Sequence, residues 1–250
     1  MRGGEDGLRG KTALVTGAAR RIGRACALAL ARRGMNVVIH FHRSRTEAEK
    51  VRREIIRLGA RAWTVQGDLS CPDSSEQVFA DAVKAAGPVD LLLNNASIYG
   101  ESRLASLAMR DLVRNLSINA IAPFLLARQL AAQRREGMVI NFLDARLSRH
   151  DSGYAAYHVS KSLLLTLTRM MAVEFAPRVR VNAVAPGAIL PPAGKGAAYM
   201  RKLAAANPLR RVGDLREITE AVLYLAGTRF VTGQVLFVDG GYHLRGKDEG

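Results

Sequence analysis

Short runs of apolar and β-branched residues recur along the 250-residue chain, and segments with helical periodicity follow the first six of them. The runs are continuously apolar rather than alternating, as expected of strands buried on both faces of a parallel sheet. Strands are predicted at Thr12–Thr16, Asn36–His40, Arg61–Gln66, Val89–Leu93, Met138–Leu143, Val179–Val184 and Gln234–Val238. Helices are predicted at Ile22–Arg33, Arg45–Leu58, Ser74–Ala86, Leu107–Ser117, Ala120–Arg135, Tyr154–Phe175 and Leu215–Ala226.

Strands that alternate with helices predict an α/β protein. The expected architecture is a single Rossmann-type doubly wound domain over residues 1–250, with a seven-stranded parallel sheet flanked by helices. Gly34, Gly59 and Gly87 follow three of the predicted helices, where left-handed caps are expected. No linker, internal repeat or second domain is indicated.

Three segments fall outside the alternation. Residues 1–10 and 244–250 are short polar tails. Residues 188–206 interrupt the last helix connection with Pro191-Pro192 and two glycines. Since ligands of such sheets bind at the carboxyl ends of the strands, we expect this loop to cover a substrate, and a plain surface loop is the alternative.

The composition is typical of a globular protein, with 48% hydrophobic and 24% charged residues, and excludes disordered, collagenous and coiled-coil classes. No apolar stretch approaches the ~20 residues of a membrane span, and the N-terminus lacks the apolar core of a signal peptide. We therefore expect a soluble cytoplasmic protein without a membrane partner. Cys26 and Cys71 match no metal motif and make no disulfide framework, so no metal is expected.

The net charge of +15 is the unusual feature of the composition, with 37 basic and 22 acidic residues. Such a balance raises the possibility of a nucleic-acid partner. However, the arginines are scattered, often as pairs on helices such as Arg32-Arg33, no block of five like charges occurs, and aromatic residues make up 6%. The pattern favours solvated helix faces and no nucleic-acid partner.

A glycine-containing turn joins the first strand to the first helix. Glycine lets the backbone approach a phosphate, and the helix N-terminus supplies free N–H groups and a positive dipole. The pattern is weak by itself because Arg21 occupies one of the three usual glycine positions, and an ordinary glycine turn is the alternative. Arg21 would place a positive charge beside a phosphate or a substrate. The predicted cofactor contacts here are Gly17, Arg20, Arg21, Ile22 and Gly23.

The end of the second strand indicates which dinucleotide is bound. Folds that select NAD usually carry an acid there, whereas this chain has His42, Arg43 and Ser44. An arginine binds a 2′-phosphate through charge-assisted hydrogen bonds. The sequence therefore predicts NADP(H), with a basic helix start as the alternative.

Two further segments complete the predicted cofactor site. Asp68, with Leu69 beside it, follows the third strand and is placed to accept from the adenine amino group, a role compatible with that of a helix N-cap. Asn95, Ala96 and Ser97 follow the fourth strand, where small polar residues let the backbone approach the nicotinamide ribose.

Tyr157 and Lys161 are the strongest chemical signal. Residues four apart share one face of a helix, so the phenol and the ammonium point into the same space. A neighbouring lysine cation lowers the pKa of a tyrosine from its usual value near 10, which predicts a proton donor at neutral pH.

The order of these motifs resembles the short-chain dehydrogenase/reductase family, over nearly the whole chain. Asn119 and Pro186-Gly187 also match that family's order. The resemblance implies that Lys161 holds the nicotinamide ribose, that Asn119 supports a water-mediated proton relay, and that Pro186 and Gly187 contact the cofactor. It also implies a homotetramer.

Two departures from the common pattern are informative. Arg21 replaces a glycine, and Asp144 stands thirteen residues before Tyr157, where serine is usual. Both resemble the pteridine reductase branch, as do His40–Ser44, Asn95–Ser97, Asn119–Phe124 and Asp239–Tyr242. That branch reduces dihydropterins and related folates with NADPH. The substrate residues that this resemblance implies are Arg21, Ser97, Tyr99, Asp144 and Tyr157, with Tyr99 stacking the pterin on the nicotinamide and Asp144 orienting Tyr157.

The chemistry of a carboxylate at position 144 also favours a pterin substrate. Carbonyl reduction develops an oxyanion, which a neutral hydroxyl stabilises and a carboxylate does not. A pterin instead presents N–H groups from which Asp144 can accept. The sequence predicts an NADPH-dependent oxidoreductase that reduces a pterin or folate, with Tyr157, Asp144 and Lys161 assisting protonation. The alternatives are a 3-oxoacyl or other carbonyl reductase with a chance substitution at 144, and a non-catalytic nucleotide- or nucleic-acid-binding protein.

Overall fold

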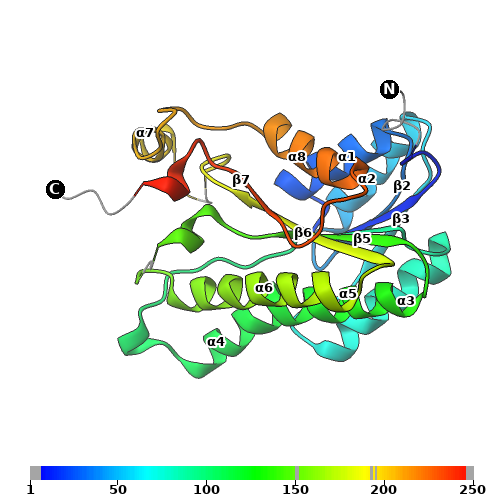
Figure 1. Cartoon of the computed structure of the whole chain (residues 1–250), viewed down its shortest axis with the longest axis horizontal. Helices are drawn as coiled ribbons and strands as arrows, with labels where there is room; N and C mark the ends of the chain where they lie inside the picture. The colour runs from blue at the N-terminus through cyan, green and yellow to red at the C-terminus, as the bar shows by residue number, and fades with distance from the viewer. Residues whose placement is uncertain (1–6, 150–151, 192–193, 195, 246–250) are drawn as a thin grey trace.

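Seven parallel strands form the centre of the molecule, in the order β3-β2-β1-β4-β5-β6-β7 (Figure 1). A computed structural model describes residues 7–149, 152–191, 194 and 196–245. The seven predicted strands and their parallel arrangement are confirmed. The strands are β1 (Thr12–Val15), β2 (Asn36–Phe41), β3 (Ala62–Gln66), β4 (Leu91–Asn94), β5 (Gly137–Phe142), β6 (Val179–Pro186) and β7 (Val235–Val238).

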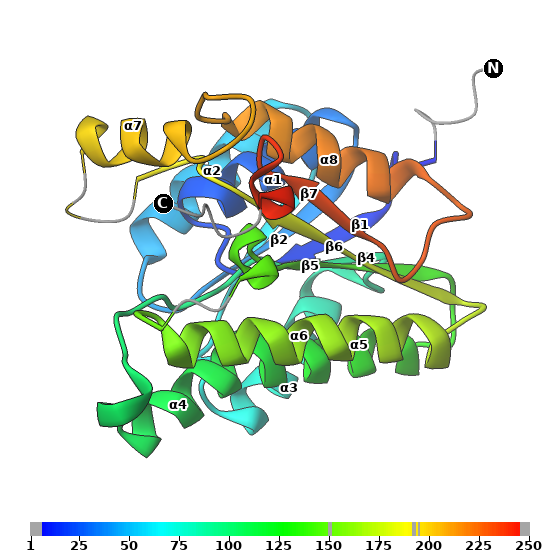
Figure 2. The same ribbon diagram turned by 60° about the vertical axis from the view of Figure 1, so that its left-hand side comes forward.

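Helices cover both faces of the sheet. The helices α1, α2 and α8 lie on one face and α3, α5 and α6 on the other, so the sheet is the middle of three layers (Figures 1 and 2). Their bounds are α1 (Arg21–Arg32), α2 (Arg45–Arg57), α3 (Pro72–Ala86), α4 (Met109–Leu116), α5 (Ala122–Ala132), α6 (Ala155–Glu174), α7 (Ala197–Ala205) and α8 (Leu215–Gly227).

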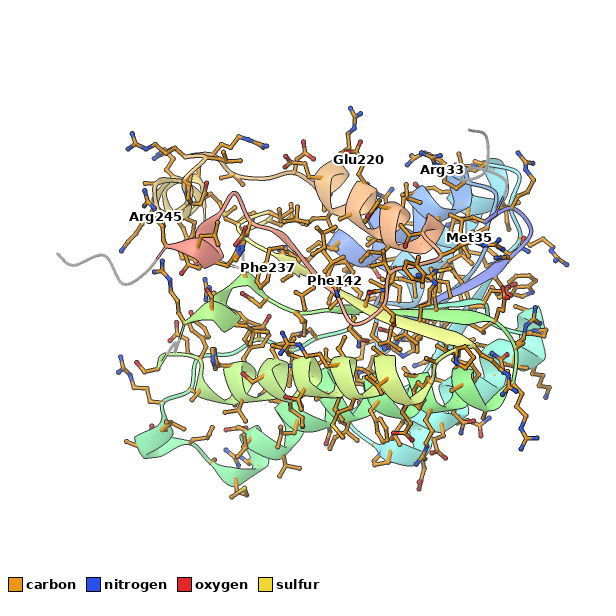
Figure 3. All side chains as sticks on the ribbon, viewed as in Figure 1. Arg33, Met35, Phe142, Glu220, Phe237 and Arg245 are labelled. Atoms are coloured by element: carbon orange, nitrogen blue, oxygen red, sulfur yellow. The ribbon has the colours of Figure 1, made fainter. Side chains whose placement is uncertain are left out.

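The core consists of two hydrophobic layers, one on each face of the sheet. Successive residues of a strand point to opposite faces. Val15 and Leu93 accordingly pack in the layer under α1 and α8, whereas Leu14 and Leu92 pack in the layer over α3 and α5. Figure 3 shows how side chains fill both layers. The continuously apolar strands of the sequence are therefore strands buried on both sides.

The helices differ from prediction in three places. The expected gap between Leu107–Ser117 and Ala120–Arg135 is wrong, because the π-helix Ser117–Ile121 joins α4 to α5. Helix α7 lies inside the segment 188–206, for which no helix was predicted. Helix α3 begins at Pro72 rather than Ser74 and its N-cap is Cys71.

The helix ends settle two expectations made from the sequence. Gly34 and Gly59 have φ of 80° and 86°, and the residues after them donate back into the helix, so the predicted left-handed caps are confirmed there. The cap predicted at Gly87 is wrong, because its φ of 80° is combined with a ψ of −167°, outside the left-handed region. The N-cap role considered for Asp68 is wrong, because Cys71 takes that position. The Asp68 carboxylate instead accepts from the backbone N–H of Ser70 at 2.9 Å.

Within the described residues, no helix combines the length and the apolar character that crossing a membrane requires. The predicted polar tails fall largely on residues 1–6 and 246–250, which lie outside the described residues, as does Pro192 of the predicted proline pair.

Candidate active site

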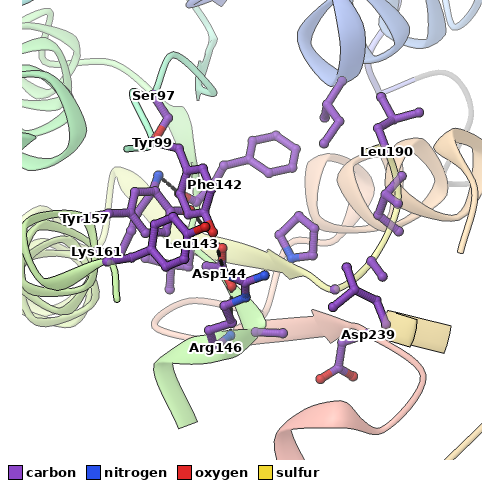
Figure 4. Close-up of a pocket in the computed structure, with 18 of the residues that line it drawn as sticks. Ser97, Tyr99, Phe142, Leu143, Asp144, Arg146, Tyr157, Lys161, Leu190 and Asp239 are labelled. Atoms are coloured by element: carbon purple, nitrogen blue, oxygen red, sulfur yellow. Dashed lines mark hydrogen bonds between the residues drawn. The ribbon is translucent and has the colours of Figure 1, made fainter. Parts of the chain in front are cut away.

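A cavity of about 700 Å³ opens at the carboxyl ends of β4, β5, β6 and β7 (Figure 4). This is the edge at which ligands of doubly wound sheets bind. Its lining brings together residues predicted from five separate segments of the chain. Of the predicted site residues, the lining includes Arg21, Ile22, Asn95, Ser97, Tyr99, Asp144, Tyr157, Lys161, Pro186 and Gly187.

The turn from β1 to α1 is packed so closely that only glycine fits at two positions. Gly17 has a φ of 62°, and a Cβ added there would lie 3.1 Å from the Cα of Ala96. A Cβ on Gly23 would lie 2.5 Å from both the carbonyl oxygen of Gly17 and the side-chain nitrogen Nδ2 of Asn95. Since the first N–H groups of a helix have no acceptor within it, this turn presents donors that could hold a phosphate.

Hydrogen bonds hold this turn to the end of β4. The hydroxyl of Thr16 accepts from the backbone N–H groups of Asn95 and Ala96, at 2.9 and 3.0 Å. The side-chain amide of Asn95 donates to the carbonyl oxygens of Thr16 and Gly17, at 2.8 and 3.2 Å. The predicted cofactor residues Gly17, Asn95 and Ala96 thus form one bonded unit.

His40 supports the same turn, a role that the sequence did not reveal. The Nδ1 atom accepts from the N–H of Gly17 and the Nε2 atom donates to the carbonyl of Gly67, both at 3.2 Å. Burial lowers the pKa of His40 to about 4, so the ring is neutral and can accept. The signal in the sequence was a histidine at the end of an apolar predicted strand.

The predicted 2′-phosphate residues lie on the surface at the ends of β2 and β3. His42 and Arg43 are exposed, and His42 Nε2 lies 3.7 Å from a carboxylate oxygen of Asp68. Ser44 is the N-cap of α2. This edge could hold a 2′-phosphate, because no acid occupies it between residues 40 and 45.

Two other predicted cofactor residues lie away from the cavity. The guanidinium of Arg20 is exposed and forms an ion pair with Glu47 at 2.7 Å. Leu69 is buried in the hydrophobic layer with Val78 and Phe79. Neither residue belongs to the cavity lining. Their predicted contacts would therefore be made outside the cavity, to the ribose and adenine of the cofactor.

Arg21 has a positive φ of 53°, in the region of backbone conformation that favours glycine. Its guanidinium lines the cavity and donates to the carbonyl oxygen of Pro191 at 2.8 Å. Arg21 therefore links the start of α1 to the segment 188–206.

Asp144, Tyr157 and Lys161 meet at the floor of the cavity (Figure 4). The Tyr157 hydroxyl donates to Asp144 Oδ2 at 2.9 Å, and Asp144 Oδ1 accepts from the N–H of Arg146 at 2.8 Å. Lys161 Nζ donates to the carbonyl of Phe142 at 2.7 Å and lies 5.8 Å from the centre of the Tyr157 ring. The tyrosine is thus bonded to the acid and not to the lysine.

The prediction that Lys161 lowers the pKa of Tyr157 is wrong in this structure. Burial and the negative charge of Asp144 raise the pKa of Tyr157 well above 10. Burial also lowers the pKa of Lys161 to about 8, because a charged ammonium is poorly solvated there. Tyr157 therefore keeps its proton throughout the neutral range, and Lys161 is the group of the pair that titrates near it.

Asn119 lies at the centre of the π-helix and is fully buried. Its carbonyl oxygen accepts from the N–H of Ile98 at 2.9 Å and from the hydroxyl of Ser97 at 3.1 Å. Its amide donates to Ile98 O and to the Ser160 hydroxyl, both at 3.0 Å. Asn119 therefore fixes the segment that carries Ser97, and its hydrogen bonds go to residues other than Tyr157 and Lys161.

Tyr99 lines the cavity beside Tyr157. Its ring stacks on Tyr154 at 4.3 Å between centroids and meets the Tyr157 ring edge-on at 4.9 Å. Its hydroxyl accepts from Arg146 at 2.6 Å. The aromatic face predicted at Tyr99 is therefore present beside the Asp144–Tyr157 pair.

Pro186 ends β6, and Gly187 follows it; both line the cavity. The N–H of Gly187 donates to the carbonyl of Val238 at 2.9 Å. A Cβ on Gly187 would lie 2.6 Å from the Cα of Asp239, so this position requires glycine for the close approach of β7. Among the described residues, no group of three or more histidine, cysteine or acidic side chains could hold a metal ion.

Comparisons with known proteins give the family. The family model described as enoyl-(acyl carrier protein) reductase matches residues 17–243. An uncharacterized oxidoreductase of Mycobacterium tuberculosis is 37% identical over 92% of this chain and 91% of its own. The chain belongs to the short-chain dehydrogenase/reductase family, whose members are oxidoreductases.

Relatives with different substrates are similarly close. The 3-oxoacyl-[acyl-carrier-protein] reductase of Synechocystis is 33% identical over 94% of this chain and 97% of its own. The crystal structure of the FolM alternative dihydrofolate reductase 1 of Brucella canis, complexed with NADP, is 34% identical, with a TM-score of 0.90, over 99% of this chain and 98% of that one. Similarity alone therefore does not choose the substrate of this short-chain dehydrogenase/reductase.

Sequence reasoning missed several lining residues of this family member, among them Arg146, Tyr154 and Tyr199. Arg146 donates to the hydroxyls of both Tyr99 and Tyr199, at 2.6 and 3.2 Å. Burial lowers the pKa of Arg146, but Asp144 and Tyr99 together raise it above its ordinary value. Arg146 follows the carboxyl end of β5 by four residues, which was the available signal; Tyr199 depended on α7, which was not predicted.

Proposed function

We propose that the protein is an NADPH-dependent pteridine reductase, acting on a dihydropterin or a dihydrofolate-type substrate. The observation that carries the proposal is the hydrogen bond of 2.9 Å from Tyr157 to Asp144, at the floor of a cavity walled by Tyr99. A carboxylate there can accept from the N–H and amino groups of a pterin ring. The likeness to the FolM protein of Brucella canis supports the same substrate class.

The turn before α1 and the edge of β2 would hold the cofactor. Gly17 and Gly23 let the turn pack against Asn95, and the free N–H groups at the N-terminus of α1 would hold the pyrophosphate. His42 and Arg43 would bind the 2′-phosphate that distinguishes NADP(H) from NAD(H). When bound, NADPH supplies the hydride for the carbon of the pterin C=N bond.

The rest of the cavity would orient the pterin. Its ring would stack on Tyr99, and Ser97 and Arg21 would line its edge. Asp144 would accept from a ring N–H, which fixes the C=N bond relative to Tyr157. The segment 188–206 would cover the bound ring, since Leu190, Tyr199 and Leu203 line the cavity.

The proton for the ring nitrogen would come through Tyr157. Its raised pKa keeps the phenol protonated, so its O–H is available as a donor throughout the neutral range. Lys161 lies 5.8 Å from the ring centre and has a pKa of about 8, so it titrates close to neutral pH. Asp144 accepts the phenol hydrogen in this structure, and this hydrogen would turn to the ring nitrogen when the pterin binds.

A 3-oxoacyl or other carbonyl reductase is the second candidate. The similarity to the 3-oxoacyl reductase of Synechocystis favours it. The charge at Asp144 disfavours it, because the oxyanion of a reduced ketone would develop beside a carboxylate.

The deciding experiment compares substrates and one substitution. NADPH oxidation is measured with dihydrobiopterin, dihydromonapterin and dihydrofolate, and with acetoacetyl thioesters and simple ketones. We expect turnover of the pteridines, and Asp144→Ser should lower their kcat/KM about a hundredfold, the usual size of a lost acid–base group. Turnover confined to the carbonyl compounds would falsify the proposal.

A second substitution, Tyr157→Phe, tests the proton donor. It removes the hydroxyl and keeps the ring against Tyr99. Turnover of every substrate should cease while NADPH still binds, as measured by cofactor fluorescence. Unchanged turnover would exclude Tyr157 as the donor.

A further inference from the structure

Tyr157 lies in the first turn of α6, the part of a helix that is least held by its own backbone. The first four N–H groups of a helix have no acceptor within it. In α6 the N–H of Ala155 donates to the carbonyl oxygen of Ser102 at 2.9 Å, and the N–H of Ala156 donates to the Ser102 hydroxyl at 3.1 Å. These two bonds fix the start of the turn, ahead of Tyr157.

Ser160 holds the same turn from its C-terminal side. Its hydroxyl donates to the carbonyl oxygen of Tyr157 at 2.7 Å and accepts from the side-chain amide of Asn119 at 3.0 Å. A serine hydroxyl has one hydrogen to donate and two lone pairs that accept, so both bonds can form together. Ser160 and Asn119 are fully buried, and Asn119 lies in the π-helix Ser117–Ile121. The hydroxyl of Ser160 therefore joins the backbone of Tyr157 to the π-helix.

The same set of bonds continues to the wall of the cavity. The carbonyl oxygen of the Asn119 side chain accepts from the Ser97 hydroxyl at 3.1 Å and from the N–H of Ile98 at 2.9 Å. Ser97 and Tyr157 both line the cavity (Figure 4). Hydrogen bonds through Asn119 and Ser160 thus connect the segment after β4 with the residue that carries the phenol.

The contacts of Asn119 show what the Ser160 hydroxyl contributes. Without it, the Asn119 amide would keep the carbonyl oxygen of Ile98 at 3.0 Å, but its second hydrogen would have only the side-chain oxygen of Asn115 at 3.4 Å. A buried N–H that lacks a good acceptor is unfavourable, so the π-helix and α6 would move relative to each other. Tyr157 would move with α6, whereas its partner Asp144 lies outside that helix.

We propose that Ser160 is a positioning residue, which holds the phenol of Tyr157 where it can protonate the substrate. Ser160 acts through the backbone of Tyr157 and does not belong to the cavity lining. The inference rests on one part of the proposed function, the role of Tyr157 as proton donor. It does not depend on which substrate is reduced.

Ser160→Ala tests the inference, because it removes the hydroxyl and little else. Single turnovers are measured with whichever of the pteridine and carbonyl compounds the native enzyme reduces. We expect the rate constant to fall about tenfold, since a displacement of about 1 Å costs about a hundredfold. The KM of the substrate and the Kd of NADPH should stay unchanged, because Ser160 contacts neither molecule.

The solvent deuterium isotope effect separates positioning from a merely structural role. A displaced phenol slows proton transfer relative to hydride transfer, so the isotope effect should increase in Ser160→Ala. A structural role would instead lower the amount of active enzyme, which reduces the amplitude of the single turnover and leaves the isotope effect as it is. That result would overturn the inference.

Three further variants complete the set. Ser162→Ala removes a hydroxyl two residues further along α6, on the opposite face of the helix, and should change none of these quantities. In an Asn119→Ala background, Ser160→Ala should have little further effect, because the partner is already absent. A full effect in that background would overturn the link through Asn119. Ser160→Cys keeps a weaker hydrogen-bonding group and should show a smaller loss, even if Ser160→Ala does not fold.

Crystal structures of the native chain and of Ser160→Ala, or of Ser160→Cys, give a measurement that needs no substrate. We expect the hydrogen bond of 2.9 Å between Tyr157 and Asp144 to lengthen or break. A phenol that keeps its place overturns the inference, whatever the rates are. Native enzyme that reduces carbonyl compounds and no pteridine overturns the proposed function, but the role of Ser160 is then decided on the carbonyl substrate.

Discussion

Burial and the charge of Asp144 together set the electrostatics at the floor of the cavity. Burial raises the pKa of Tyr157, and Asp144, which accepts from that phenol, raises it further. Burial lowers the pKa of Lys161 to about 8, against an opposing effect of Asp144. The tyrosine is thus a neutral hydrogen-bond donor, and the lysine is the group that titrates near neutral pH.

The buried lysine predicts how stability depends on pH. Its pKa of about 8 in the folded chain lies below the ordinary value of 10.5, so between these values the unfolded chain binds more protons. The free energy of unfolding should therefore gain about 2 kcal/mol from this group between pH 8 and pH 10. The measurement is the difference in unfolding free energy, by urea denaturation, between the native chain and Lys161→Met at each pH.

Taking the difference removes the contributions of other groups, such as Cys26, whose pKa burial raises to about 12. A difference that stays constant from pH 8 to pH 10 would mean that Lys161 keeps an ordinary pKa in the folded protein. A difference that changes in the opposite direction would mean that a partner holds its charge.

The sequence revealed individual site residues to unequal degrees. Tyr157 and Lys161 could be paired from their spacing, because a helix brings residues four apart together. The pKa values of these two side chains could not be predicted, because the partner of the tyrosine, Asp144, lies on another element thirteen residues away. Arg146 was missed for a related reason: its contacts to Tyr99 and Tyr199 depend on how three distant segments pack.

At the scale of elements, the site depends on the contact between the first turn of α1 and the end of β4. Gly17 and Gly23 on one side meet Asn95 and Ala96 on the other, and His40 holds the turn from β2. Three strands thus converge on one backbone segment, which fixes the position of the donors that would face a pyrophosphate.

Gly23→Ala tests this contact. The added methyl would come 2.5 Å from both Gly17 O and Asn95 Nδ2, so α1 must move away from β4. We expect a loss of about 2 kcal/mol in the free energy of unfolding, as for an overpacked core, and weaker binding of NADPH. Urea denaturation and titration of cofactor fluorescence measure the two effects.

Gly7→Ala is the control for Gly23→Ala, because a methyl added there meets no atom within 4 Å. It should change neither quantity. If Gly23→Ala binds NADPH as tightly as the native chain, then the close approach of α1 to β4 is not needed for the cofactor.

Elements with a strong apolar pattern could be predicted, and those that depend on packing could not. All seven strands follow from continuous apolar runs. The π-helix Ser117–Ile121 has no periodicity of its own, and it places Asn119 against Ile98 through hydrogen bonds that form only in the folded chain. Helix α7 was missed because the glycines and prolines before it indicate a loop.

At the scale of the whole molecule, the net charge of +15 divides into a surface part and a part near the site. Many arginines form exposed ion pairs between elements, such as Arg24 with Glu54 and Arg128 with Glu76. Exposed pairs of this kind contribute little to stability. The homotetramer implied by the family resemblance stays a prediction.

The basic edge of β2 makes the charge relevant to cofactor choice. Arg43 is exposed at this edge, and NADPH differs from NADH by one phosphate. Arg43→Ala should therefore lower the preference for NADPH over NADH about tenfold, because a charge-assisted bond to phosphate is lost. Initial rates with each cofactor, at several salt concentrations, measure that preference, which should fall with salt in the native chain more steeply than in the variant.

Arg110→Ala removes the same charge from an exposed site on α4 and separates a local contact from the field of the whole molecule. If the +15 charge acted only by attracting anions over long range, both substitutions would change the rates with NADPH by the same small factor. If Arg43 holds the 2′-phosphate, its loss alone changes the preference. Equal preferences in the two variants would therefore assign cofactor selection to the overall charge rather than to the residues that follow β2.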